Sequence, residues 1–393
     1  MTTISRRDLL TRGAAGVLAV TFGPRVTQFQ VSAQQPNANA LITRQASPFN
    51  AEPPLPALIE NWITPVDSFY VRSHGDIPVV EAKDLTLSID GLVEKPLSFT
   101  LAELVERFPA AKTTATLTCA GNRRAEFAAT KKVGGVQWNA GAIGNAEWQG
   151  VRLADVLKLA GVKSEARHVW FEGRDQVTEK SVTFPFGGSI PIEKALDSAA
   201  TGATLLANRM NGQPLTPAHG FPLRNIVPGY IGARSVKWLH KITVAERPSP
   251  NHFVADVYKL VPEDNAELIA KTSPIYEFLL NSAICLPTSD TAPAGERITV
   301  KGFALTNGVV GRSVEKVVVS ADGGMTWKTA KVTSRQSDFC WIFWSVELPL
   351  SKDSDRLLVR ATDSSGETQP RECPWNYKGY QFNGWHSVKL KRA

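Results

Sequence analysis

The chain has 393 residues, more than a single hydrophobic core usually supports, so its length favours two domains. With 43% hydrophobic and 21% charged residues, its composition is that of a globular protein and excludes a disordered or fibrous chain. The formal net charge of +7 is not gathered into a Lys/Arg block, which excludes the pattern typical of nucleic-acid-binding proteins.

The first 33 residues resemble an export signal. The sequence Ser-Arg-Arg-Asp-Leu-Leu at 5–10 precedes a small, apolar stretch at 13–20 that is too short to span a bilayer. This pattern is typical of the twin-arginine pathway, so we expect cleavage after Ala33 and a mature protein in the periplasm or cell envelope, without a transmembrane span. A disordered basic tail is the alternative. Residues 34–56, rich in Pro, Gln, Asn and Ala, are expected to form a linker or surface arm.

Between residues 57 and 246, strand-like and helix-like patterns alternate, as they do in mixed α/β domains. Apolar residues at period two or in short runs predict strands at 85–91, 168–172 and 235–244. Helical spacing predicts short helices at 101–108, capped by Thr100, and at 151–160.

After residue 246 the pattern changes to a proline-punctuated connector, 247–270, followed by a region dominated by strands. Period-two alternation predicts strands at 297–305, 314–320, 328–333, 339–348 and 356–362. These short runs indicate an immunoglobulin-like β-sandwich over 271–393. Within it, residues 320–327 match the hairpin turn called an Asp box, which we expect to be structural.

The cysteines are widely and irregularly spaced, so the sequence leaves their pairing open: Cys119, Cys285, Cys340 and Cys373. No Cys-x-x-Cys-His occurs, so no covalently attached c-type haem is encoded. Cys119 is followed by Ala-Gly-Asn and then by Arg123 and Arg124. Nearby guanidinium groups would hold a cysteine as thiolate, the form that binds a soft metal, although such a cysteine is by itself more often a buried thiol.

The string Thr-Cys-Ala-Gly-Asn-Arg-Arg at 118–124 resembles the molybdenum-ligand signature of the sulfite oxidase family. Further motifs of that family follow in its order at 69–74, 148–153, 171–173, 210–212, 219–224, 232–238 and 375–386. The resemblance covers residues 47–393 and implies an α+β chain, with a mixed α/β molybdopterin-binding domain at 57–246. An immunoglobulin-like dimerisation domain at 271–393 would follow. It also implies molybdenum held by one molybdopterin, with Cys119 as the ligand from the protein.

The resemblance further implies which residues contact the pterin and its phosphate: Tyr70, Val71, Arg72, Ser73, His74, Cys119, Asp175, His219, Arg224, Ser235, Val236 and Lys237. Their chemistry suits this role. Arg224 would bind a phosphate through a two-pronged fork and Lys237 as a point charge. Asp175 would accept hydrogen bonds from amino groups of the pterin, and the histidines would donate directed ones. The alternative for each histidine is a core residue whose hydrogen bonds are satisfied.

The residues implied on the substrate side are Arg72, Cys119, Arg124, Trp138, Tyr258 and Lys378. Because sulfite is an anion that must approach an anionic metal centre, several cations have to converge there. The two arginines would face sulfite, the tryptophan would line the wall, and Tyr258 would lie beside a metal-bound oxygen. Lys378 stands where family sulfite oxidases usually carry arginine, so the charge is kept but the planar fork is lost, which leaves the exact substrate open. Surface salt bridges are the alternative role of the arginines.

By resemblance, the chain is expected to be a homodimer that oxidises sulfite to sulfate. Since only the signal and linker precede residue 47, electrons are expected to pass to an external acceptor such as a c-type cytochrome. Alternatives on the same scaffold are sulfane-sulfur oxidation within a thiosulfate-oxidising complex, nitrate reduction and sulfoxide reduction. The first is the strongest rival, because family nitrate reductases are usually fused to haem and flavin domains and sulfoxide reductases generally lack the sandwich. A non-catalytic secreted binding protein is the alternative from another class.

Overall fold

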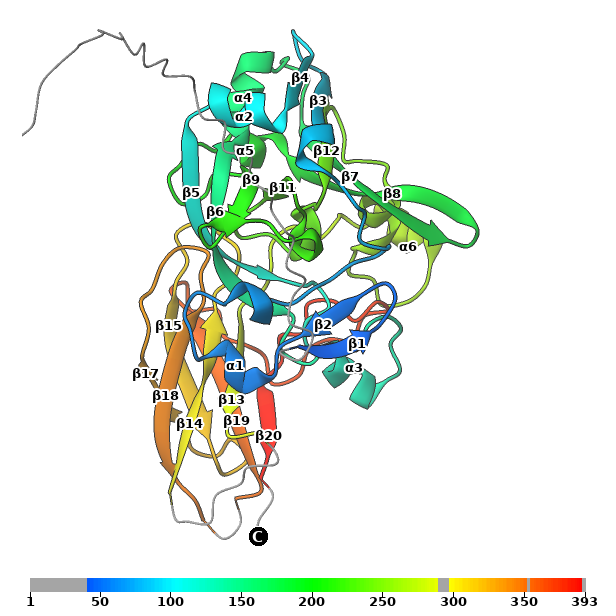
Figure 1. Cartoon of the computed structure of the whole chain (residues 1–393). Helices are drawn as coiled ribbons and strands as arrows, with labels where there is room; N and C mark the ends of the chain where they lie inside the picture. The colour runs from blue at the N-terminus through cyan, green and yellow to red at the C-terminus, as the bar shows by residue number, and fades with distance from the viewer. Residues whose placement is uncertain (1–40, 289–296, 352–353, 391–393) are drawn as a thin grey trace, which may run out of the picture. The chain divides into compact units, whose positions relative to one another are not determined.

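The computed structural model describes residues 41–288, 297–351 and 354–390 (Figure 1). The predicted export signal and the first part of the predicted arm lie outside this range. Within it, no helix is both long enough and apolar enough to cross a membrane. The described chain begins with a two-stranded hairpin of β1 (Ile42–Gln45) and β2 (Asn50–Glu52).

The mixed α/β part contains two five-stranded sheets. The first has the order β4-β3-β12-β7-β8 and is formed by β3 (Thr86–Gly91), β4 (Leu97–Thr100), β7 (His168–Glu179), β8 (Val182–Pro191) and β12 (Leu239–Ala245). Its central strand β12 pairs in parallel with β3 and antiparallel with β7. The second runs β10-β9-β6-β5 with β11 beside β9, and is formed by β5 (Ala110–Thr118), β6 (Ile143–Arg152), β9 (Leu205–Met210), β10 (Gln213–Pro214) and β11 (Arg224–Ile226).

The helices of the described chain are short: α1 (Leu55–Leu58), α2 (Leu101–Arg107), α3 (Arg124–Thr130), α4 (Leu153–Ala160), α5 (Ile192–Leu196) and α6 (Ala266–Lys271). The predicted start of α2 is confirmed, since Thr100 and Glu103 form a capping box. Helix α4 begins two residues later than predicted. The reason is that Val151 and Arg152 still pair with β9 and so remain in the sheet.

The C-terminal part is a sandwich of two four-stranded antiparallel sheets, as the strand pattern predicted (Figure 1). One sheet has the order β13-β14-β18-β17: β13 (Asn281–Leu286), β14 (Arg297–Leu305), β18 (Ile342–Pro349) and β17 (Lys331–Val332). The other has the order β16-β15-β19-β20: β16 (Lys328–Thr329), β15 (Val314–Ser320), β19 (Arg356–Asp363) and β20 (His386–Lys389). Side chains of both sheets share one core, which includes Val300, Trp344 and Val359.

Two strand predictions in the sandwich differ from the structure. Residues 328–333, predicted as one strand, form β16 and β17, which pair with strands of different sheets. Strand β18 begins at Ile342 and not at Phe339, because Phe339 has a φ of 56°, which lies outside the range of extended strands.

The Asp box is stabilised by a hydrogen bond within the turn, because the Asp322 carboxylate accepts the Thr326 N–H at 2.9 Å. All four cysteines are free thiols.

Buried arginine Arg123 links the two parts of the chain. Its guanidinium is fully buried and donates to both carboxylate oxygens of Glu126, at 2.6 and 2.8 Å. It also donates to Asn281 Oδ1 in β13 at 2.7 Å. Because this residue directly precedes α3, the same contacts fix the start of that helix against the sandwich.

This linkage gives a stability prediction with an internal control. We expect Arg123→Ala to lower the free energy of unfolding by about 3 kcal/mol, since it leaves Glu126 and Asn281 without their buried partner. Arg152 forms the equivalent i,i+3 pair with Asp155 at the start of α4, but 3.9 Å apart and with about a third of each side chain exposed. Arg152→Ala should change stability by less than about 1 kcal/mol. Urea unfolding of both variants checks this, and equal losses would contradict it.

Candidate active site

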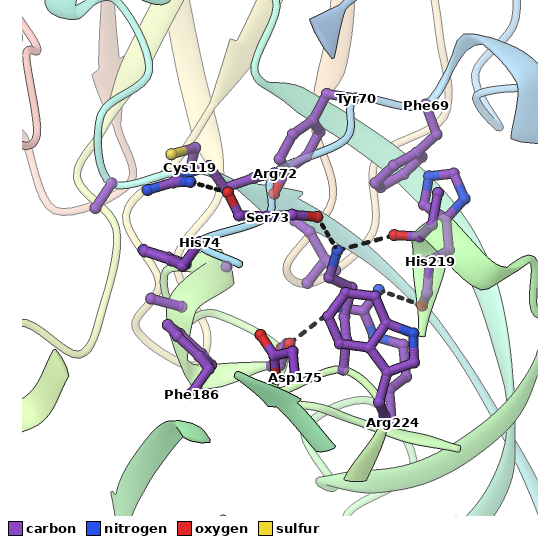
Figure 2. A pocket seen from close by; sticks show the side chains of 18 of the residues that line it. Phe69, Tyr70, Arg72, Ser73, His74, Cys119, Asp175, Phe186, His219 and Arg224 are labelled. Carbon is purple, nitrogen blue, oxygen red and sulfur yellow. Dashed lines mark hydrogen bonds between the residues drawn. The ribbon is translucent and has the colours of Figure 1, made fainter. Parts of the chain in front are cut away.

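One pocket brings together most of the predicted site residues. Those that line it are Tyr70, Arg72, Ser73, His74, Cys119, Asp175, His219, Arg224, Ser235, Lys237 and Tyr258. Figure 2 shows Cys119, Arg72 and His74 on one side of the pocket and His219 and Arg224 on the other. Segments far apart in the sequence therefore converge here.

Cys119 directly follows β5, in a turn that is held from both sides. Its N–H donates to Ala142 O at 2.9 Å, and Asn122 Oδ1 accepts the Ala142 N–H at 3.0 Å. The buried sulfur accepts the Gly121 N–H at 3.4 Å. Nowhere in the described ranges do three or more His, Cys, Asp or Glu gather to hold a metal ion. The turn thus offers one fixed sulfur ligand.

Arg72 is oriented by the main chain beside it and by Asn50 of β2. Its Nη1 donates to Asn50 Oδ1 at 3.2 Å and also to Ser73 O. The same asparagine accepts the Ser73 N–H at 3.0 Å and donates to Ser73 O at 3.1 Å. Asn50 is fully buried, so this clamp fixes the direction in which Arg72 enters the pocket.

Arg224 and Lys237 place two more cations in the pocket, and neither forms a salt bridge with a carboxylate within the described residues. Arg224 donates to His219 O and Ser235 O, both at 2.9 Å. Lys237 Nζ donates to Ser73 Oγ at 3.0 Å and to Ala218 O at 2.9 Å. Burial lowers the pKa of Arg224 to about 10. Burial, reinforced by the Arg224 charge and opposed by Asp175, lowers the pKa of Lys237, so an anion bound here would favour the charged form of the lysine.

Three buried polar atoms of lining residues have no hydrogen-bond partner within the described chain: His219 Nε2, Arg224 Nε and Asp175 Oδ1. Burial, with the nearby Lys237 and Arg224 charges, lowers the pKa of His219 to about 3, so its ring is neutral. Asp175 lies where the β7–β8 register shifts, an irregularity of the kind that re-aims side chains near active sites. These atoms are available to a bound group with both donors and acceptors.

Tyr258 and His74 form a partly buried pair in the wall of the pocket. Tyr258 Oη and His74 Nε2 are 2.9 Å apart, and the imidazole stacks on Phe186 with ring centroids 4.6 Å apart. Burial raises the pKa of Tyr258 to about 12, and burial together with Arg72 holds that of His74 well below its usual range. Both rings are therefore neutral near pH 7. In the sequence, Tyr258 directly follows a single π-helical turn, Phe253–Val257, a local irregularity often found at functional sites.

Five predicted residues do not line the pocket: Val71, Arg124, Trp138, Val236 and Lys378. The two valines and Trp138 lie in hydrophobic clusters. Arg124 is buried and donates to Lys378 O at 3.0 Å and to Val136 O at 2.9 Å. The ammonium of Lys378 lies 4.9 Å from the centre of the Tyr377 ring. The roles expected for these side chains toward cofactor or substrate stay predictions.

Several lining residues escaped the sequence analysis. Phe69 and Trp238 lie inside motifs that it used, so their place in the motif was the available signal. Gly232 also lines the pocket, and a Cβ there would lie 2.8 Å from Tyr70 Oη and 3.2 Å from Thr118 O, so only glycine fits. Nothing in the local pattern marks Asn50, whose importance arises from its contacts with residues 72 and 73.

Comparison with known proteins matches both parts of the chain. The family model described as the oxidoreductase molybdopterin binding domain matches residues 74–253, and that of the Mo-co oxidoreductase dimerisation domain matches residues 272–393. Sulfite oxidase of Gallus gallus is 38% identical over 96% of this chain and 84% of that protein. An NADH nitrate reductase of Phaseolus vulgaris is 37% identical over 98% of this chain, which spans 46% of that protein. The chain likewise spans 64% of the mitochondrial sulfite oxidase of Drosophila melanogaster.

Among solved structures, the sulfane dehydrogenase SoxCD from Paracoccus pantotrophus aligns with a TM-score of 0.74 at 27% identity. The alignment covers 96% of this chain and 97% of that one. The fold predicted from the sequence, a molybdopterin-binding α/β domain followed by a β-sandwich dimerisation domain, is confirmed.

The pocket fits a molybdopterin on its own chemistry. A pterin presents ring donors and acceptors, which suit the unpartnered atoms of His219 and Asp175. A phosphate suits Arg224 and Lys237, which lack a contacting carboxylate. Cys119 lines the same pocket and offers the soft sulfur ligand that molybdenum would need.

Asp175 gives a pH prediction for protein produced without molybdopterin. Burial raises the pKa of Asp175 from 3.8 to about 6, with Lys237 opposing the rise. The native state therefore binds this proton more tightly than the unfolded state. The resulting stability is fully present below about pH 4 and is lost as the pH rises through about 6. Asp175→Asn cannot ionise, so we expect it to gain stability relative to wild type between pH 4 and pH 7, by up to about 3 kcal/mol.

Urea unfolding of both proteins at several pH values measures this difference. Glu81→Gln, which changes an exposed carboxylate, serves as the control and should differ from wild type by a constant amount. An Asp175→Asn difference that does not change with pH would contradict the assignment.

Proposed function

The chain belongs to the sulfite oxidase family of molybdopterin-dependent oxidoreductases, and on that basis we propose that it oxidises sulfite to sulfate and passes the electrons to an external acceptor such as a c-type cytochrome. The observation that carries the proposal is the shared pocket of Cys119, Arg72 and Tyr258. It offers a metal ligand, a cation for an oxyanion and a neutral phenol in one place. The 38% sequence identity to a sulfite oxidase, over 84% of the length of that protein, supports the choice of substrate.

The bound cofactor would supply two-electron oxygen-atom transfer chemistry at molybdenum. Cys119 would bind the metal, while Arg224 and Lys237 would hold the phosphate of the molybdopterin. Arg72 and Arg124 would draw sulfite in and offset its repulsion from the metal centre. Tyr258, neutral near pH 7 and hydrogen-bonded to His74, would keep a proton at its Oη and direct it toward the reacting oxygen.

Two other reactions on this scaffold have support of their own. The SoxCD structure aligns along nearly its whole length, which favours oxidation of a sulfane sulfur. The similarity to an NADH nitrate reductase favours nitrate reduction. Assays with sulfite, thiosulfate and nitrate on one molybdenum-loaded preparation separate the three, because the turnover number for the true substrate should far exceed those for the others.

The quaternary structure is also a proposal. The match of residues 272–393 to a dimerisation domain supports a homodimer. Size-exclusion chromatography with light scattering tests this, and a monomer at micromolar concentration would exclude it.

The metal ligand gives a direct test of the proposed activity. We expect purified wild-type protein with its molybdenum quantified to reduce a c-type cytochrome when sulfite is added. Cys119→Ser should lose at least about 1,000-fold of this activity, because a hydroxyl is a poor ligand for a soft metal. Cys340→Ser is the matched control, since that buried thiol donates to Thr114 O and a hydroxyl can make the same bond. A molybdenum-loaded wild type that is inert to sulfite would exclude the proposed substrate.

Export is a separate proposal that rests on the sequence of residues 5–10. Replacing Arg6 and Arg7 together by lysine keeps the charge but removes the twin arginines. We expect the variant to remain in the cytoplasm, as measured by cell fractionation and immunoblotting against a known exported protein. Unchanged export of the variant would exclude the twin-arginine pathway.

A further inference from the structure

Loop 376–381 of the C-terminal part is fastened to the mixed α/β part at several points around the pocket. The Tyr377 N–H donates to Val261 O at 2.9 Å, and the Gln381 N–H donates to Ala120 O at 2.6 Å, next to Cys119. Lys378 O accepts from Arg124 Nε at 3.0 Å. The loop therefore contacts both the cysteine turn and the segment that follows Tyr258.

The loop is also internally fixed, so it can hold a side chain in one place. Asn376 donates to Tyr380 O at 2.8 Å and accepts the Tyr380 N–H at 2.9 Å. Gly379 has a φ of 61°, and a Cβ there would lie 2.6 Å from Val133 and 3.0 Å from the Arg124 side chain. These constraints fix the main chain at Tyr380.

The ring of Tyr380 lies against both Tyr258 and Arg124. Its centroid is 5.0 Å from that of Tyr258, with the two planes 27° apart, and 5.1 Å from the guanidinium carbon of Arg124. Tyr380 is only 6% exposed, so both contacts form away from water. An aromatic face stabilises a guanidinium without neutralising its charge. The hydrogen bonds of Arg124 likewise run to carbonyl oxygens, which leave its positive charge unneutralised.

We propose that Tyr380 is a positioning residue of the substrate site, whose ring holds Tyr258 and Arg124 in the arrangement that receives a small oxyanion. Loop 376–381 thereby makes the C-terminal part a determinant of substrate affinity as well as of assembly. This inference rests on the proposed function, which assigns Tyr258 and Arg124 to the substrate side. Lys378 contributes to the arrangement through its main-chain oxygen.

Two variants of Tyr380 and one matched control test the proposal in molybdenum-loaded protein. Phe382 packs edge-to-face against Phe127, with ring centroids 4.7 Å apart, and lies 4.8 Å from the guanidinium carbon of Arg123, so it is a comparable ring beside an arginine in the same segment. We expect Tyr380→Leu to raise the KM for sulfite about tenfold, or about 1.4 kcal/mol, with kcat within about threefold of wild type. Tyr380→Phe keeps the ring and should restore the wild-type KM, and Phe382→Leu should leave KM unchanged.

Two readouts do not depend on turnover. The dissociation constant of inorganic sulfate, measured by calorimetry, should rise in Tyr380→Leu in parallel with KM. Crystal structures of Tyr380→Leu and Phe382→Leu should show the Arg124 and Tyr258 side chains displaced only in the former. Unmoved side chains in Tyr380→Leu would overturn the proposal, as would equal changes of KM in both leucine variants. A Tyr380→Phe variant as impaired as Tyr380→Leu would also overturn it, since the hydroxyl would then be the active group.

The test of the sulfite substrate and the test of the Tyr380 role have separate readouts. If wild-type protein does not reduce cytochrome with sulfite, the proposed substrate is excluded. The positions of Arg124 and Tyr258 in the two crystal structures still decide the role of Tyr380.

Discussion

The rest of this structure depends on three cations that line one pocket and form no salt bridge with a carboxylate of the described residues. Arg72, Arg224 and Lys237 all bond to neutral oxygens, so their charges are oriented but not neutralised. Desolvating such groups is costly, and the depressed pKa of Lys237 reflects that cost. An anionic cofactor that binds here restores the balance, so cofactor binding and folding stability are linked in this protein.

The arrangement of the backbone follows from this constraint. Each cation needs a carbonyl or amide oxygen at a particular place. In regular strands, the carbonyl oxygens already accept hydrogen bonds from the neighbouring strands. Several residues that line the pocket accordingly lie where the regular pairing of the strands is interrupted or has ended. Trp238 has a φ of 51°, Asp175 lies at a register shift, and Cys119 lies just past the end of β5. The regular sheets anchor these irregular segments, so that the oxygen atoms that accept hydrogen bonds from the cations stay in place.

The same contrast explains what could be predicted from the sequence. Strands β14 and β15 and the start of α2 agree with the prediction, because period-two alternation and a capping box are local signals. Residues 235–238 have the composition of a strand and are predicted as one. In the structure the Val236 N–H donates to Asn225 Oδ1, and the strand begins only at Leu239. The candidate site came from family motifs, which group residues distant in sequence. Tyr380 was missed because its contact with Tyr258 is a long-range stacking that no local pattern encodes.

Selectivity among small oxyanions cannot come from positive charge alone, because sulfite, thiosulfate and nitrate are all attracted by the same cations. Discrimination requires donors held at particular positions. Arg124 shows how this fold achieves it, since its bonds run to main-chain oxygens of Lys378 and Val136. Its place is therefore set by the backbone of both parts of the chain and not by a partner charge. The main-chain carbonyl of residue 378 is present whether the residue is lysine or arginine. The backbone conformation of loop 376–381 therefore influences the position of Arg124 as much as the side-chain charge at residue 378 does.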